Sequence, residues 1–200
     1  MARYKGPTTR ISRRFGQQIL GSAKAFERRS YPPGQHGPKS RRKMSEYGTG
    51  LAEKQKLRYI YGLLERQFRN TFEEASRIKG VTGENLIKLL EARLDNTVYR
   101  LGIAPSRPAA RQLVSHKHVT VNGEVVNIPS FQLKAGDIIS LKGKSIANSS
   151  VTSFIRGKNP KFGWLDWNDN EKKGTFITYP ERESVPENIK EQLIVELYSK

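Results

Sequence analysis

The stretch Ser106–Asn127, SRPAARQLVSHKHVTVNGEVVN, predicts a short basic helix followed by a β-hairpin. Ser106 is placed to cap the helix, and Pro108 falls in the first turn, where its missing N–H removes no hydrogen bond. Apolar side chains recur at helical spacing and define one buried stripe: Ala109, Ala110, Leu113 and Val114. We expect the other face to point outward with its polar side chains: Arg107, Arg111, Gln112, Ser115 and Lys117.

After this helix the periodicity changes to that of strands. Valines alternate on both sides of Asn122-Gly123, the residue pair that best tolerates two positive φ angles, so we expect a tight type I′ hairpin. Further strands are expected at 131–133 and 138–141. A helix held rigidly against a small sheet can present guanidinium groups to phosphates, and the stretch contains no evident reaction chemistry.

The charge of the chain is strongly positive and unevenly distributed. Thirty-six Lys and Arg against nineteen Asp and Glu give a net charge of +17. Residues 1–60 contain fifteen basic and three acidic residues, whereas 161–200 contain six and eight. A disordered basic tail and a membrane-surface patch are the alternatives, but Arg is interleaved with Tyr, Gln, Asn and Gly, which suit contacts to phosphate, sugar and base. We therefore expect a nucleic-acid partner.

The composition also excludes several classes of protein. The chain contains no cysteine, which rules out a disulfide, a thiolate metal site and a cysteine nucleophile. No apolar run approaches the roughly 20 residues that cross a bilayer, and the basic, polar start of the chain does not form a secretory signal. We expect a cytoplasmic protein without a membrane segment.

The order of the patterns predicts an α+β protein that consists of a helical domain and a central module. The helical domain is expected at 46–92 and is completed by a C-terminal segment at 160–200 that packs on it. The module, a helix with an antiparallel β-sheet, is expected at 93–158. The basic N-terminal extension at 1–45 is rich in Gly, Pro and Arg and is expected to be mostly irregular.

Three amphipathic helices are expected in the helical domain. The first leaves three cations outside: Lys54, Lys56 and Arg58. The second carries an apolar stripe: Leu64, Phe68, Phe72 and Ala75. The third runs from a cap at Thr82 to Leu101, with a break near Arg93, and a last helix is expected at 187–198.

Five motifs in this order resemble the bacterial family of small-subunit ribosomal protein S4, and the resemblance covers essentially the whole chain. The motifs are YPPGQHG at 31–37, EKQKLR at 53–58, ERQFRN at 65–70, GEN at 83–85 and LIVELY at 193–198. The stretch at 106–127 likewise resembles the S4 RNA-binding module. Zinc-binding members of the family begin with a C-x-x-C pair, whereas 9–12 reads Thr-Arg-Ile-Ser here. The resemblance therefore implies a zinc-free form with no metal and no cofactor.

The resemblance implies a structural component of the small ribosomal subunit. Such a protein is a primary rRNA-binding protein that nucleates assembly by binding a helix junction in the 5′ domain of the small-subunit rRNA. The positions of the motifs imply RNA contact by Arg3, Tyr4, Arg13, Arg14, His36, Lys54, Lys56, Arg58, Arg66, Arg69, Asn70, Arg107, Arg111, Gln112, Ser115, His116 and Lys117.

Two further partners follow from the resemblance. Basic residues would line the channel through which mRNA enters the subunit: Lys39, Arg41, Arg42 and Lys43. The less basic C-terminal segment would contact ribosomal protein S5, an interface tied to translational accuracy. The alternative to a ribosomal role is a structured-RNA-binding or RNA-chaperone module that acts off the ribosome.

Two patterns that recur in enzymes are present, and neither indicates catalysis. His116 and His118 have no carboxylate close in sequence, so a surface or core role is favoured over a metal site. Arg93-Leu94-Asp95 resembles the catalytic sequence of RNA pseudouridine synthases, but in those enzymes a large catalytic domain follows the S4-type module, whereas Asp95 precedes it here. We expect Asp95 to pair with a neighbouring cation or to shape the helix end. The protein is expected not to be an enzyme and to have no small-molecule substrate.

Overall fold

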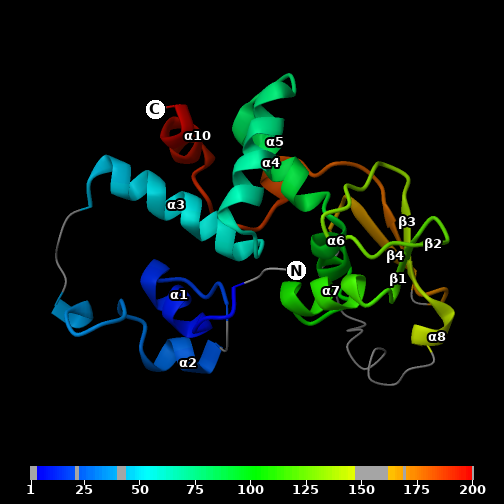
Figure 1. Cartoon of the computed structure of the whole chain (residues 1–200), viewed down its shortest axis with the longest axis horizontal. Coiled ribbons are helices and arrows are strands. Elements are labelled where there is room, and N and C mark those ends of the chain that lie inside the picture. Colours follow the sequence, from blue (N-terminus) through cyan, green and yellow to red (C-terminus); the bar gives the residue numbers. More distant parts are fainter. Residues whose placement is uncertain (1–3, 21–22, 40–43, 147–161, 169, 200) are drawn as a thin grey trace. The chain divides into compact units, whose positions relative to one another are not determined.

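The structure is a computed structural model, and it describes residues 4–20, 23–39, 44–146, 162–168 and 170–199. The chain divides into two compact units, one made of 1–74 and 188–200 and the other of 75–187 (Figure 1). The described part of the first unit is helical, whereas the second combines helices with a five-stranded antiparallel sheet. The expected α+β class is therefore confirmed.

Two distant parts of the chain form the first unit. Its elements are α1 (Thr8–Phe15), α2 (Ala23–Arg28), the 3-10 helix η1 (Gly37–Lys39), α3 (Glu46–Ile60), most of α4 (Glu65–Arg77) and α10 (Glu191–Ser199). A Cβ at Gly50 in α3 would lie 3.1 Å from the Leu193 carbonyl oxygen, so the missing side chain lets α10 approach closely. The Phe72 and Tyr198 rings stack with their centroids 4.4 Å apart. The last helix thus completes a core that begins with α3.

The N-terminal extension is more helical than its composition predicts. In α1 the side chain of Ile11 is buried, and so is Ser12. The Ser12 hydroxyl donates to the Leu20 carbonyl oxygen (2.6 Å) and accepts from two backbone N–H groups of the same loop (3.1 Å). These local hydrogen bonds satisfy backbone polar groups of the loop after the helix. The expectation of mostly irregular structure is therefore wrong for α1 and α2.

The second unit contains the expected hairpin. Its helices are α5 (Thr82–Glu91), α6 (Leu94–Arg100), α7 (Arg107–Ser115), α8 (Gly143–Ile146) and the 3-10 helix η2 (Arg182–Ser184). Its strands are β1 (Val119–Val121), β2 (Glu124–Val125), β3 (Ile138–Leu141), β4 (Leu165–Asn168) and β5 (Lys173–Phe176), in the spatial order β2-β1-β3-β5-β4. Asn122 and Gly123 between β1 and β2 have φ angles of 51° and 88°, as a type I′ turn requires.

The break near Arg93 is confirmed. The Leu94 N–H donates to the Phe131 carbonyl oxygen (2.9 Å), and the Asp95 N–H donates to that of Pro129 (3.1 Å). A neighbouring loop therefore satisfies the first N–H groups of α6, which would otherwise be buried without partners. This gives α6 a start separate from the end of α5.

Three expectations are wrong in the second unit. Thr82 is the first residue of α5 and not its cap. Val81 holds the cap position, and its side chain makes no capping hydrogen bond. Residues 131–133 form only an isolated bridge instead of a strand. β4 and β5 extend the sheet beyond β3, so the segment 160–200 does not complete the helical domain as a whole. Of the residues 160–200, only 188–200 belong to the first unit.

The helices of the second unit share an apolar core with β1 and with alternate positions of β3 and β5. The buried side chains include Leu86, Leu90, Leu94, Val98, Leu113, Val114, Val119, Ile139 and Phe176. Gly174 in β5 is the point of closest approach, because a Cβ there would lie 2.5 Å from Cδ1 of the buried Leu101. Among the helices described, none combines the length and apolar character needed to cross a bilayer.

We predict that Gly174→Ala lowers the free energy of unfolding by about 1–3 kcal/mol, because the added methyl overpacks Leu101. Gly163→Ala is the control, since a Cβ at Gly163 meets no atom of the described residues within 4 Å. The double variant Gly174→Ala/Leu101→Val should lose less stability than the sum of the two single changes. Urea unfolding measures five proteins, namely wild type, Gly174→Ala, Leu101→Val, their double variant and Gly163→Ala. Equal losses for the two alanine variants would contradict the packing described.

Candidate RNA-binding site

The module helix α7 is anchored as its sequence predicts. Ser106 Oγ accepts a hydrogen bond from the Ala109 N–H (3.3 Å), and Pro108 lies in the first turn. The buried side of the helix consists of Ala110, Leu113 and Val114. The helix is therefore fixed at its start by a cap and along its length by packing, which leaves one side for polar groups.

The C-terminal end of α7 exposes three polar side chains: Gln112, His116 and Lys117. Lys117 has a φ of 63°, and this left-handed residue turns the chain from α7 towards β1. Ser115 is less available, since its hydroxyl donates to the Arg111 carbonyl oxygen at 2.8 Å. An amide, an imidazole and an ammonium group thus remain open to solvent at one end of the helix.

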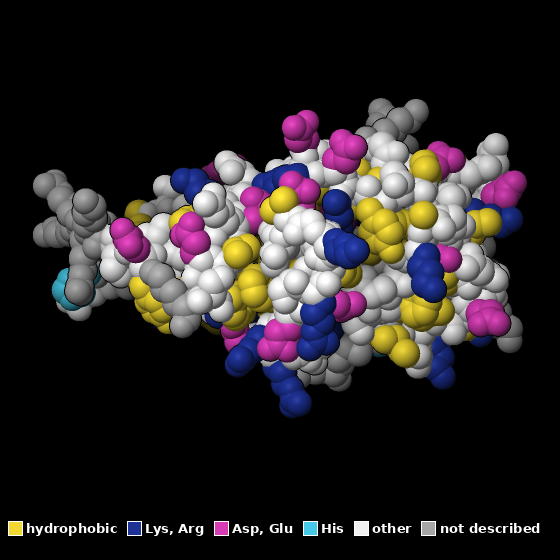
Figure 2. Space-filling model, turned by 90° about the horizontal axis from the view of Figure 1, so that it is seen from above, with side chains coloured by type: hydrophobic (Ala, Val, Ile, Leu, Met, Phe, Trp, Pro, Cys, Tyr) yellow, Lys and Arg dark blue, Asp and Glu magenta, His cyan; other side chains and the backbone are white. Residues whose placement is uncertain are grey.

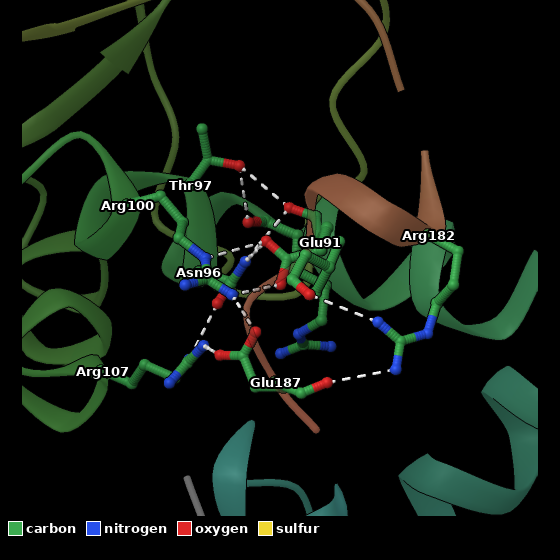
Figure 3. Close-up of polar contacts among 9 residues, drawn as sticks. Glu91, Asn96, Thr97, Arg100, Arg107, Arg182 and Glu187 are labelled. Carbon is green, nitrogen blue, oxygen red and sulfur yellow. Dashed lines mark hydrogen bonds and ion pairs between the residues drawn. The ribbon is translucent and has the colours of Figure 1, made fainter. Parts of the chain in front are cut away.

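The expectation that Arg107 and Arg111 point outward is wrong. Arg107 Nε donates to Asn96 Oδ1 at 2.8 Å, and its Nη2 lies 2.6 Å from Glu187 Oε1 (Figure 3). Arg111 Nη1 lies 2.9 Å from Asp95 Oδ2. Helical periodicity places both arginines on the polar side of α7, but it cannot reveal acceptors that come from other segments.

A buried carboxylate is central to these contacts (Figure 3). The side chain of Glu91 is fully buried, and Arg100 contacts it through Nε (3.1 Å) and Nη2 (2.6 Å). Asn96 Nδ2 donates to the same carboxylate at 2.7 Å. Arg100 Nη2 also reaches Glu187 Oε2 at 2.5 Å, and Arg182 donates to the Glu187 carbonyl oxygen at 3.1 Å. The network therefore joins α5, α6 and α7 to the segment after η2.

Opposing effects set the ionisation of Glu187. Burial disfavours its charged form, but the charges and hydrogen bonds of Arg100 and Arg107 outweigh burial and hold the pKa of this carboxyl below its ordinary value. Glu187 is therefore ionised at neutral pH and acts as an anionic partner to both guanidinium groups.

Asp95 pairs with a cation, as expected. Arg93 contacts it with both ends of the guanidinium, Nε to Oδ1 at 3.1 Å and Nη2 to Oδ2 at 2.9 Å. Both side chains are buried, so the pairing compensates for the cost of removing two charges from water. Arg111 shares Oδ2, and Asp95 thus serves two guanidinium groups.

The three cations of α3 are not outside, which is a second correction. Lys54 Nζ pairs with Glu65 Oε1, and Arg58 Nε lies 3.7 Å from the other oxygen of the same carboxylate. Lys56 Nζ donates to the Asn188 carbonyl oxygen at 2.7 Å. The start of α4 and the segment before α10 supply these partners, so the sequence of α3 alone does not predict them.

The three candidates for RNA contact in α4 are accessible, unlike those of α3. Arg66, Arg69 and Asn70 are exposed, whereas Phe68 on the opposite side is buried. Arg69 Nε makes an exposed pair with Glu73 Oε1 at 3.2 Å, a contact that solvent weakens. Figure 2 shows lysines and arginines interspersed with carboxylates on the face in view, so the net charge is not all available to a polyanion.

The candidates in the N-terminal extension differ in their surroundings. Arg14 and His36 are exposed, and Tyr4 is 40% exposed. Arg13 Nε donates to the Tyr31 carbonyl oxygen at 3.0 Å, and its guanidinium lies 4.8 Å from the centroid of that ring. Four candidates lie outside the described residues, and so does the side chain of Lys39: Arg3, Arg41, Arg42 and Lys43.

Sequence reasoning missed most of the buried network. Glu91 and Arg100 are nine residues apart across the break between α5 and α6, so no helical spacing links them. Glu187 lies 87 residues beyond Arg100, and no local signal identifies it. Across the described ranges, no three or more His, Cys, Asp or Glu side chains are grouped to hold a metal ion.

A capped helix on an antiparallel sheet, with an amide, an imidazole and a cation at its open end, can contact the phosphates, sugars and bases of a nucleic acid. Residues 3–91 match the family model of the ribosomal protein S4/S9 N-terminal domain, and 92–139 match that of the S4 domain. The chain belongs to the ribosomal protein S4 family, and the family resemblance and the absence of enzyme function are both confirmed.

Curated relatives match along the whole chain. The small ribosomal subunit protein uS4 of Cytophaga hutchinsonii is 59% identical over 201 residues, and the alignment covers 100% of both chains. Proteins of the same description from Christiangramia forsetii and Parabacteroides distasonis are 58% and 57% identical over 201 residues, again with complete coverage of both chains.

We predict that Glu187→Gln lowers stability at neutral pH but not in acid. Because the pKa of Glu187 is lowered on folding, its ionised form stabilises the fold fully above the ordinary value of 4.5, and this contribution disappears as pH falls through the folded-state pKa. The difference in unfolding free energy between wild type and variant should therefore shrink below about pH 4.5. Urea unfolding over pH 3–7 measures it, with the exposed Glu183→Gln as control. A difference that is independent of pH would contradict the pairing.

Proposed function

We propose that this protein is a component of the small ribosomal subunit that binds the rRNA of that subunit and thus acts in the ribosome of the cytoplasm. The observation that carries the proposal is full-length identity of 55–59% to proteins described as small ribosomal subunit protein uS4. The S4 domain match at 92–139 covers α7, the helix whose open end exposes polar side chains.

We further propose that the protein is a primary rRNA-binding protein and nucleates assembly at a helix junction in the 5′ domain. Structured RNA is recognised mainly through phosphates, 2′-hydroxyls and shape, which suits separate groups of cations on rigid helices. The open end of α7 supplies one group, with Gln112, His116 and Lys117. The exposed side of α4 supplies another, with Arg66, Arg69 and Asn70 at the i, i+3 and i+4 spacing of one helix face.

The RNA roles of the remaining candidates differ with their contacts. Arg13, Arg14, Tyr4 and His36 are proposed to contact RNA from the extension. Lys54, Lys56 and Arg58 are already held by protein acceptors, so any phosphate they meet must share or replace those acceptors. Arg107, Arg111 and Ser115 face the same competition.

Two finer roles rest on the family resemblance alone. We propose that basic residues at 39–43 line the channel through which mRNA enters the subunit. We also propose that the C-terminal segment contacts ribosomal protein S5 and thereby affects translational accuracy. The six basic and eight acidic residues at 161–200 support a protein contact over a phosphate contact.

We expect the affinity for a transcript of the 5′ domain to fall steeply with salt. If about ten phosphates are neutralised, the slope of log affinity against log salt is near −9 for a duplex and somewhat shallower for other forms. Filter binding between 0.1 and 0.5 M KCl measures it, and a slope shallower than about −3 would contradict a broad phosphate footprint. Sedimentation of the native protein only in the free fraction would instead favour a role off the ribosome.

A second prediction tests the open end of α7. Lys117→Asn removes the cation with a residue that tolerates the left-handed backbone, and it should weaken binding roughly 3- to 10-fold and reduce the salt slope by about one. Lys172→Asn is the matched control, because Lys172 has the same charge and a similar φ of 52° in the β4–β5 turn. Equal losses for the two variants would show that only net charge matters, and would argue against a specific contact at Lys117.

A further inference from the structure

Of the ion pairs around Arg100, the one that involves α7 is more exposed than the one between α5 and α6. The side chains of Glu91 and Arg100 are 0% and 5% exposed, whereas those of Glu187 and Arg107 are 12% and 16% exposed. Arg100 is also the more strongly held of the two arginines, because it contacts Glu91 through two nitrogens and Glu187 through one. The network therefore has a fixed inner pair and an outer pair that solvent can reach.

The outer pair can separate without leaving Glu187 unpaired. Glu187 uses Oε1 for Arg107 and Oε2 for Arg100, so it keeps an ion pair when Arg107 is released. Arg107 in turn is positioned by Asn96, which accepts from its Nε at 2.8 Å, and by the Tyr99 ring, whose centroid lies 4.6 Å from the guanidinium carbon. These two contacts hold the guanidinium in place while its Nη2 exchanges Glu187 for another anion.

Carboxylates and phosphates present similar acceptor oxygens to a guanidinium, and arginine binds both groups in the same planar manner. Arg107 is the first residue of α7, the helix that the family match places in the S4 domain. An RNA strand that follows α7 from its open C-terminal end back to its first turn would meet Arg107 only in competition with Glu187.

We propose that the contact between Arg107 and Glu187 is an exchange site for one RNA phosphate. In the free protein Glu187 occupies the outer side of the Arg107 guanidinium. In the complex a phosphate oxygen takes that place, and Glu187 remains on Arg100. The inference rests on the proposed binding of rRNA. It assigns Glu187 the role of an internal competitor that lowers the affinity of Arg107 for phosphate. A polyanion that does not also contact other Lys and Arg side chains of the protein therefore binds weakly at Arg107.

Removal of the competing carboxylate disturbs the fold less at Arg107 than at Arg111. Arg111 shares a single oxygen of Asp95 with the buried Arg93, so removal of that carboxylate would leave Arg93 without its two-point partner. Removal of the Glu187 charge leaves Arg100 paired with Glu91 and Arg107 bonded to Asn96. Glu187→Gln is therefore the substitution that tests the exchange with least damage to the fold.

The experiment is a double-mutant cycle with the full chain and a transcript of the small-subunit rRNA 5′ domain. Wild type, Glu187→Gln, Arg107→Gln and the double variant are titrated at 0.15 M KCl and over a range of salt. Glu187→Gln should bind roughly 3- to 10-fold more tightly, because Arg107 no longer has to leave a carboxylate. Its salt slope should stay within about one of the wild-type slope, since Arg107 meets phosphate in both complexes. Arg107→Gln should bind more weakly, and the double variant should show no gain over Arg107→Gln.

Two controls separate exchange from general electrostatics and from misfolding. Glu183→Gln removes the same charge from the exposed η2, and its gain should be less than twofold. Glu187→Asp keeps the charge but shortens the side chain, and it should give a smaller gain if the glutamine variant does not fold by circular dichroism. Unchanged or weaker binding of folded Glu187 variants, or a gain that persists without Arg107, overturns the exchange site. Failure of wild type to bind the transcript instead overturns the proposed function, and the exchange site with it.

Discussion

The carboxylate of Glu91 is fully buried, and this one charge constrains the helical half of the second unit. An unpaired carboxylate in the interior would cost several kcal/mol, so a guanidinium and an amide must be held against it. Arg100 and Asn96 reach it across the break at which α5 ends with Glu91 and α6 begins with Leu94. The break between the helices and the burial of Glu91 therefore depend on each other.

The local features of this fold could be predicted from the sequence. Ser106 caps α7, Asn122-Gly123 forms the expected turn, and the pattern around Arg93 indicates the helix break. In each case the controlling interaction involves residues within a few positions, so periodicity and turn chemistry contain the necessary information. The pairing of Asp95 with a neighbouring cation is predictable for the same reason, because Arg93 is two residues away.

The candidate site was predicted less well, because its decisive contacts are distant in sequence. Arg107 faces a glutamate 80 residues later, and Lys56 is held by a carbonyl oxygen 132 residues later. The addition of β4 and β5 to the sheet depends in the same way on Gly174, whose missing side chain accommodates Leu101. A count of cations consequently overstates the charge that a partner can meet, since several guanidinium groups are already neutralised within the fold.

The packing of α10 against α3 affects the order in which the chain can fold during synthesis. Residues 75–187 are contiguous, so the second unit has all its elements once they have left the ribosomal tunnel. The first unit needs 188–200, which are made after the whole second unit, before Leu193 can cover the surface beside Gly50. Until α10 has been made, the apolar side of α3 lacks its partner, and a nascent chain truncated before α10 would leave the N-terminal half open to proteases and chaperones.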